Sequence, residues 1–187
     1  EVVGASRDDA AGEAFDKIGR VLGLPYPGGA ALDRLSKQGD AAKYPLPPAI
    51  IKDHPYDFSF SGLKTAAVNL IHNAQQKGEK LDAAALAHDF TRAVSDELVP
   101  RAIAAAKRSG HKVMAAAGGV AANSIIRADL QEACRREGIT LYLPPLKLCG
   151  DNGAMIGAQA YYEYLAGNVA DMSLNAYATK SILGETV

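Results

Sequence analysis

The sequence predicts an α/β fold whose core is interrupted by a helical insertion, and three observations lead to this prediction. The last third of the chain alternates short apolar runs with amphipathic stretches in the order strand, helix, strand, helix, which is typical of a parallel α/β unit. Residues 2–5 form another apolar run, followed by apolar residues at helical spacing. The middle of the chain, about 31–109, has mostly helical patterns. We therefore expect a core built from 1–30 and 110–187 and a helical insertion at about 31–109.

The individual elements follow from periodicity and from helix-ending residues. Helices are expected at about residues 11–22, 30–38, 62–78, 82–109, 124–137 and 152–165. Asp82 is expected to cap the long fourth helix, Pro100 to kink or restart it, and Gly110 to end it. Strands are expected at 2–5, 112–117 and 139–143, with a shorter extended arm at 58–60. The prolines of residues 39–55 predict an extended surface connection.

Composition limits the classes of protein and partner. With 187 residues, 48% of them hydrophobic, the chain is long enough for one sizeable core. Its formal net charge of -1 means that any contact with nucleic acid must be local. Cys134 and Cys149 have neither metal-ligand nor disulfide spacing, which predicts a reducing compartment, the cytoplasm. No apolar run is long enough to span a bilayer, so we expect no membrane partner. Because a strand is expected directly after Glu1, we expect the chain to be cut from a longer protein.

Residues 118–123 lie between an expected strand and an expected helix and begin with two glycines. Glycines let a backbone approach a ligand, and the amides at the start of a helix attract an anion, so a phosphate or an adenylate would fit here. An ordinary tight turn with Asn123 as the helix cap explains the same pattern. Both interpretations stay open at this point.

Asp16 and Asp33 lie on either side of a turn that contains Gly28 and Gly29. Carboxylates beside such a turn can accept hydrogen bonds from ribose hydroxyls while the glycines let the sugar approach. Asp16 also belongs to a polar stripe on its helix, and a solvated helix face is the simpler explanation of that stripe.

Asp151 stands just before the last expected helix, where a carboxylate either caps the helix or binds a metal. The four histidines, His54, His72, His88 and His111, show no metal-ligand spacing. Any metal bound by Asp151 would therefore need ligands from another segment.

Two further groups of residues are candidates for contact with phosphate. Residues 59–65 place hydroxyls and a lysine at a helix start, which fits either a phosphate contact or a capped helix. The basic groupings are candidate tRNA contacts, although most such clusters are only solvated: Lys107, Arg108 and Lys112, and Arg127, Arg135 and Arg136.

Five segments together resemble the TsaD family of tRNA threonylcarbamoyladenosine biosynthesis transferases, formerly described as glycoproteases. They occur in the family's order and are residues 8–17 (DDAAGEAFDK), 26–29 (YPGG), 59–65 (SFSGLKT), 118–123 (GGVAAN) and 151–156 (DNGAMI). The resemblance implies an actin/Hsp70/sugar-kinase-like (ribonuclease H-like, or ASKHA) fold, of which this chain is part of the C-terminal lobe and lacks the N-terminal lobe.

The resemblance also implies a reaction and a set of site residues. The family transfers the threonylcarbamoyl group from threonylcarbamoyl adenylate to the exocyclic amine of the adenosine 3′ of the anticodon in tRNA. Carried over by motif, Asp16, Gly29, Asp33 and Asn123 are expected to contact the adenylate. Asp151 is expected to be the catalytic carboxylate and a ligand of one iron or zinc ion.

The same resemblance implies what this chain needs in order to act. The other metal ligands are two histidines four residues apart in the N-terminal half, so we expect this chain to be inactive by itself. Expected partners are tRNA, threonylcarbamoyl adenylate, a paralogous scaffold subunit and a small ATPase. Ala30 stands where the family has proline, and Gly150 where it has threonine. The second change removes a hydroxyl beside Asp151 and makes the details of the metal site less secure.

Two alternatives keep the fold and change the function. A kinase-like ATPase would use the loop 118–123 to hold nucleotide phosphates. A non-catalytic scaffold lobe would bind partners only, although the presence of Asp151 argues against it. A protease is disfavoured because no metal-activated water with a nearby general base can be identified.

Overall fold

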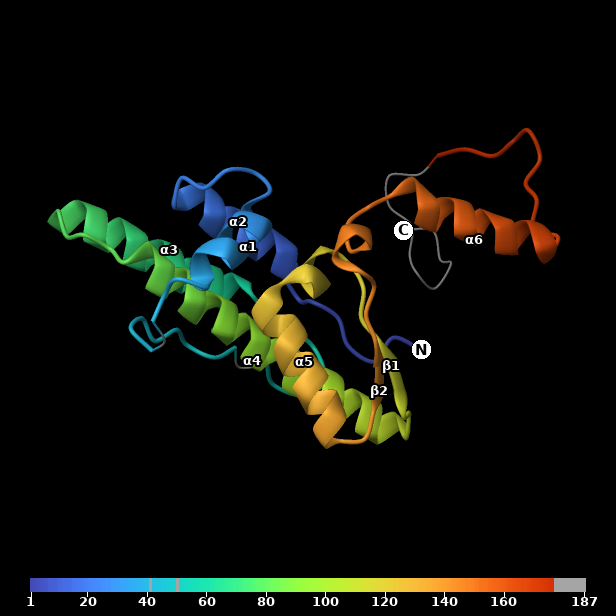
Figure 1. The fold of residues 1–187 in the computed structure, drawn as a ribbon, viewed down its shortest axis with the longest axis horizontal. Coiled ribbons are helices and arrows are strands. Elements are labelled where there is room, and N and C mark those ends of the chain that lie inside the picture. Colours follow the sequence, from blue (N-terminus) through green and yellow to red (C-terminus); the bar gives the residue numbers. More distant parts are fainter. Residues whose placement is uncertain (41, 50, 177–187) are drawn as a thin grey trace. The chain divides into compact units, whose positions relative to one another are not determined.

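The computed structural model describes residues 1–40, 42–49 and 51–176, which divide into two units, Glu1–Gly150 and a second that begins at Asp151. Within these residues the first unit contains five α-helices and a two-stranded sheet (Figure 1). The helices are α1 (Ala11–Val21), α2 (Gly28–Ser36), α3 (Ser61–Lys77), α4 (Ala83–Ser109) and α5 (Ser124–Arg136). The strands are β1 (Val113–Ala115) and β2 (Thr140–Tyr142), and two 3-10 turns follow them, η1 (Gly119–Ala122) and η2 (Leu146–Leu148).

The long helix α4 begins and ends where the sequence predicts. The side chain of Asp82 accepts a hydrogen bond from the backbone nitrogen of Ala85 at 3.0 Å, which confirms the expected cap. Gly110 ends the helix with a φ of 70°, a left-handed conformation that favours glycine. Of the two possibilities at Pro100, the restart is wrong, because α4 is one helix of 27 residues that contains this proline. Val99 and Ile103 are buried on either side of the proline, and this packing holds the helix together where the missing hydrogen bond weakens it.

The predicted parallel unit near the end of the first unit is confirmed. Strand β1 pairs in parallel with β2, with Val113 opposite Thr140 and Ala115 opposite Tyr142. Helix α5 makes the crossover between the two strands (Figure 1), as parallel pairing requires.

The predicted strand at 2–5 is wrong. In this part of the chain the backbone forms a single parallel bridge, between Ser6 and Phe58, which is also all that remains of the expected arm at 58–60. Val2 and Val3 are 49% and 38% exposed. A strand needs a neighbouring backbone to pair with as well as an apolar sequence, and residues 2–5 have no ladder partner among the described residues.

Most of the core lies between the helices. One buried cluster joins α1, α2, α3 and α4, and at its centre the rings of Phe15 and Phe90 meet edge to face at 5.5 Å. A second cluster joins the end of α4 to α5 and the sheet, through residues such as Ile103 and Leu130. The predicted boundaries of the helical insertion, about 31–109, stay a prediction, since helices from both predicted parts share the first cluster.

The proline-rich connection between α2 and α3 is fastened to α4 by two buried acids. Asp89 accepts hydrogen bonds from the backbone nitrogens of residues 42, 43 and 44 at 2.7, 2.9 and 2.8 Å. Glu97 accepts one from Ala49 at 3.0 Å and pairs with Arg101. Burial by itself would raise the pKa of Asp89, but the hydrogen bonds it accepts outweigh burial and lower that pKa. The connection between α2 and α3 is therefore held against α4 by specific hydrogen bonds.

The second unit contains helix α6 (Gly153–Leu165). Its cap is Asn152, whose side chain accepts a hydrogen bond from the backbone nitrogen of Met155 at 3.0 Å. The capping role considered for Asp151 thus belongs to its neighbour. In the described ranges, no helix combines the length and the apolar character needed to cross a membrane.

Candidate functional site

Helices α1 and α2 approach each other closely because glycines stand at their contact. A Cβ atom on Gly19 would lie 2.8 Å from the Cα of Gly28, and one on Gly28 would lie 2.9 Å from the Cα of Asp16. Real Cβ contacts are not that short, so any larger residue at these two positions would push the helices apart. The close approach brings the start of α2 against the middle of α1.

Asp16 uses this proximity to hold the glycine turn. Its Oδ1 accepts a hydrogen bond from the backbone nitrogen of Gly29 at 3.0 Å. A carboxylate has about four lone-pair sites on its two oxygens, so this one bond leaves capacity for a ligand. The side chain is half-buried, which keeps it open to a molecule arriving at the turn.

Asp33 and Asn123 together organise the start of α5. Oδ1 of Asp33 accepts hydrogen bonds from the backbone nitrogen and the hydroxyl of Ser124, at 2.8 and 2.7 Å. Oδ1 of Asn123, which is buried, accepts from the next two backbone nitrogens, Ile125 and Ile126, both at 3.1 Å. The interpretation of Asn123 as a cap is confirmed, and because the cap uses only the oxygen, the side-chain nitrogen is still a donor for other contacts.

These residues surround one cavity. It has a volume of about 650 Å³, within the range of small-molecule sites. Asp16, Gly29, Asp33 and Asn123, the four residues expected to contact an adenylate, all line it. The other lining residues are Gly12, Phe15, Pro27, Ala30, Arg34, Gly119, Val120, Ala122, Leu146, Cys149 and Gly150. The structure thus gathers positions up to 107 residues apart, from Asp16 to Asn123, although their role in binding stays a prediction.

The start of α5 is poorly suited to hold a phosphate. A phosphate bound at a helix start needs the first backbone amides of that helix as donors. Here the amides of Ser124, Ile125 and Ile126 already donate to Asp33 and Asn123. A negative charge arriving there would also meet the carboxylate of Asp33. The cavity is therefore better matched to the hydroxyls of a sugar than to a phosphate at this point.

Asp151, the expected catalytic residue and metal ligand, belongs to the second unit, where it precedes α6 and is exposed. Across the part of the chain that the structure describes, no three acids, cysteines or histidines come close enough together to hold a metal ion. The described residues therefore do not form the metal site by themselves.

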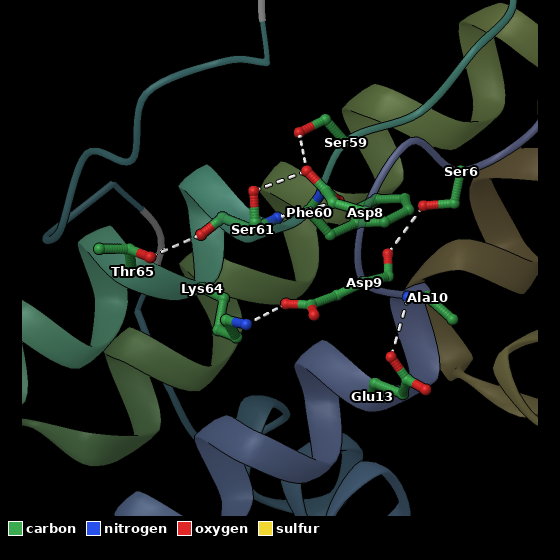
Figure 2. A network of polar contacts seen from close by, with 10 residues as sticks. All are labelled: Ser6, Asp8, Asp9, Ala10, Glu13, Ser59, Phe60, Ser61, Lys64 and Thr65. Carbon is green, nitrogen blue, oxygen red and sulfur yellow. Dashed lines mark hydrogen bonds and ion pairs between the residues drawn. The ribbon is translucent and has the colours of Figure 1, made fainter.

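The segment 59–65 is joined to the segment before α1 by the polar network in Figure 2. Asp8 accepts hydrogen bonds from the hydroxyls of Ser59 and Ser61 at 2.5 and 2.6 Å, and from the backbone nitrogens of Phe60 and Ser61 at 2.9 and 3.3 Å. Next to it, Asp9 pairs with Lys64. Of the two interpretations of this segment, the structure supports the capped helix, with a cap supplied from 52 residues away in the case of Phe60.

The electrostatics of Asp8 show how strong this cap is. Burial by itself would raise the pKa of its carboxyl, but the bonds from Ser59, Ser61 and Phe60 outweigh burial and lower the pKa from 3.8 to about 2. Asp8 therefore stays charged throughout the neutral range. The sequence contained no signal that Asp8 would bind residues 59–61, because nothing in either segment indicates that the two lie close together in the fold.

Most of the basic candidates for tRNA contact have partners in the protein. Lys107 pairs with Glu137 at 2.6 Å, and Arg135 pairs with Glu132 at 2.7 Å. Arg108 lies over the ring of Tyr56, 5.3 Å from its centre. Arg127 is turned inward and bonds to backbone carbonyls. Of these four, Arg127 fits the tRNA interpretation least.

Comparison with known proteins gives the family. The sequence profile of TsaD, tRNA N6-adenosine threonylcarbamoyltransferase, matches residues 1–158. This chain belongs to the TsaD family. Proteins called tRNA N6-adenosine threonylcarbamoyltransferase from Moorella thermoacetica and Enterococcus faecalis are 47% and 49% identical to it over 175 and 178 residues. Each alignment covers 94% of this chain and 51% of the relative, so the chain spans about half the length of these curated TsaD relatives.

A solved structure shares the fold. The crystal structure of T. kodakarensis HypF superposes with a TM-score of 0.61 at 20% sequence identity, over 85% of this chain and 20% of that protein. At this identity the likeness concerns architecture alone. It agrees with the predicted α/β class.

Proposed function

We propose that this chain forms the adenylate-binding part of a tRNA adenosine threonylcarbamoyltransferase. The observation that carries the proposal is the cavity of about 650 Å³, which collects Asp16, Gly29, Asp33 and Asn123 from three separate segments. These are the residues that family resemblance assigns to the adenylate. The names of the TsaD relatives support the same reaction class.

In this proposal the two acids bind the sugar. Asp16 and Asp33 would accept hydrogen bonds from the ribose hydroxyls, using lone pairs that their present partners leave free. Gly29 would let the sugar approach the backbone, since glycine has no side chain of its own. Asn123 would offer its amide nitrogen while its oxygen continues to cap α5.

The reaction itself is a transfer of an acyl-type group. The exocyclic amine of the tRNA adenosine attacks the carbamoyl carbon of threonylcarbamoyl adenylate and forms a new carbon–nitrogen bond. The bond from that carbon to the phosphate oxygen breaks, AMP leaves with the electron pair, and the amine loses a proton to solvent. The role of the cavity is to hold the adenylate still, which lowers the entropic cost of bringing the two substrates together.

The proposal includes a metal ion, for which this chain would provide one ligand. Asp151 would supply one carboxylate ligand to an iron or zinc ion, and a histidine pair outside this sequence would supply the others. Such an ion would polarise the carbamoyl oxygen as a Lewis acid. By itself this chain would then bind nucleotide without transferring the group.

The proposed partners are those that the TsaD resemblance implies for threonylcarbamoyladenosine biosynthesis. They are tRNA, threonylcarbamoyl adenylate, a paralogous scaffold subunit and a small ATPase, in the cytoplasm. The kinase-like alternative would have to hold its phosphates with the loop 118–123, because the amides at the start of α5 donate to Asp33 and Asn123. A magnesium-dependent phosphoryl transfer would favour that alternative.

The test is transfer of labelled threonylcarbamoyl from its adenylate to tRNA. The chain would be joined to the N-terminal half of the Moorella thermoacetica relative and compared with its Asp151→Ala variant. We expect transfer to fall at least about 100-fold, since even the neighbours of metal ligands cost 10–100-fold when changed. Asp40→Ala, at an exposed acid outside the cavity, is the matched control and should keep full activity. A folded fusion without the Asp151 substitution that binds AMP and never modifies tRNA would contradict the proposal.

A further inference from the structure

Arg127 lies in the first turn of α5 and its guanidinium contacts two loops. Nη1 donates a hydrogen bond to the carbonyl of Ala121 at 3.0 Å, and Nη2 donates one to the carbonyl of Pro144 at 2.8 Å. Nη1 also lies 3.9 Å from the Sγ of Cys149. Because a guanidinium is planar and its donors are rigidly arranged, it holds these two carbonyls at a defined separation.

Both loops form walls of the cavity. Ala121 belongs to η1, whose neighbours Gly119, Val120 and Ala122 line the cavity. Pro144 leads into η2, which supplies Leu146 and is followed by Cys149 and Gly150. The two loops are over 20 residues apart in the sequence, and one side chain ties them together.

Cys149 marks how closely the second loop is packed. Its Sγ lies 3.8 and 3.7 Å from the carbonyls of Pro144 and Pro145, and the residue is only 4% exposed. Because Nη1 of Arg127 lies against this Sγ, we expect a shift of the loop away from Arg127 to expose the thiol. Cys149 is therefore a built-in reporter for the position of the wall.

The bonding of Arg127 differs from that of the other arginines on α5. Arg135 and Arg136 pair with acids at the surface. Arg127 has no carboxylate partner in the described part of the chain, and its charge is met by carbonyl oxygens. A partly buried charge is costly unless its donors are used, so this arrangement favours one fixed position of both loops.

We propose that Arg127 is a positioning residue of the cavity, which holds the η1 and η2 loops at the separation required for nucleotide binding. It acts through the loops and does not touch the ligand. The identity of the ligand rests on the proposed function. The fixing of the two loops by Arg127 rests only on its own hydrogen bonds.

The test uses the whole 187-residue chain and two readouts. The first is the rate at which iodoacetamide alkylates Cys149 without ligand, followed by mass spectrometry, with buried Cys134 as internal reference. The second is the Kd for AMP. Arg127→Gln should raise the Cys149 rate and the Kd about tenfold or more, because losing hydrogen bonds from a charged donor makes the fixed position of the loops about tenfold less favoured. Arg127→Lys should be intermediate, and Arg135→Gln, an exposed change on the same helix, should resemble wild type.

The outcomes separate this inference from the proposed function. If Arg127→Gln left Cys149 and the AMP affinity unchanged, the inference would be overturned. It would also be overturned if Cys134 became reactive to the same extent, since that result means general unfolding. If Cys149 alone were uncovered while wild type failed to bind AMP, the holding role would stand and the proposed ligand would be wrong.

Discussion

Asp8→Asn is expected to weaken the attachment of α3 to the segment before α1. The carboxylate of Asp8 accepts four hydrogen bonds, from the hydroxyls of Ser59 and Ser61 and from the backbone nitrogens of Phe60 and Ser61. Asparagine offers one oxygen and sets an amide donor against the remaining donors, so about half of these bonds are lost.

The magnitude follows from the pKa of Asp8, which the hydrogen bonds lower from 3.8 to about 2 against the raising effect of burial. A difference of this size corresponds to about 2 kcal/mol, and because Asp8 is exposed, screening by water reduces its contribution to roughly 1 kcal/mol. Since the pKa is lower in the folded state, the contribution is fully present above pH 3.8 and is lost as the pH falls toward 2.

The assay is urea unfolding of wild type and Asp8→Asn at a series of pH values. We expect wild type to be more stable by about 1 kcal/mol at neutral pH, and the difference to shrink below a pH of about 4. Glu79→Gln makes the same chemical change at an exposed acid and should show no such dependence. A difference that is absent at neutral pH, or that stays constant down to a pH of about 3, would refute the reasoning.

Two further substitutions test how the core and the cavity are built. Gly28→Ala would place a Cβ 2.9 Å from the Cα of Asp16, so we expect a loss of about 1–3 kcal/mol in urea unfolding and weaker AMP binding. Gly62→Ala, where a Cβ within α3 meets open space, should cause no loss of stability and should leave AMP binding unchanged. Phe90→Ala removes a fully buried ring that meets Phe15 edge to face, and the expected loss is about 3–5 kcal/mol in the same assay. A loss below about 1 kcal/mol for Phe90→Ala would mean that the helices do not share this core.

The helices could be predicted because their signals are local. The Asp82 cap is confirmed, since its side chain accepts a hydrogen bond from the backbone nitrogen of Ala85, only 3 residues away, and α5 begins at Ser124 directly after the Asn123 cap, as expected. Helical periodicity and capping both act within one or two turns of the chain. The strand at 2–5 could not be judged in this way, since pairing depends on a neighbour elsewhere in the sequence.

In the candidate site, too, local sequence signals could be predicted and contacts between distant segments could not. Asp16, Gly29, Asp33 and Asn123 were identified from motifs, and the cavity that they line needed the fold to bring them together. Leu146 and Cys149 carried no signal, because they belong to an irregular loop whose position is set by β2 and by Arg127. Arg127 itself was a candidate for tRNA contact, because its charge is evident from the sequence. Its backbone carbonyl partners, Ala121 and Pro144, become evident only in the structure.

The sequence by itself determined the helices, the α/β class and the family, since periodicity, caps and motifs each depend on residues that are close together in the sequence. Only the tertiary structure decided that Asp8 caps a helix 52 residues away from it at Phe60, and that Arg127 joins the two loops of the cavity. The physical reason is that a hydrogen bond between distant segments depends on where the buried core places them. That placement comes from the packing of the helices around Phe15 and Phe90.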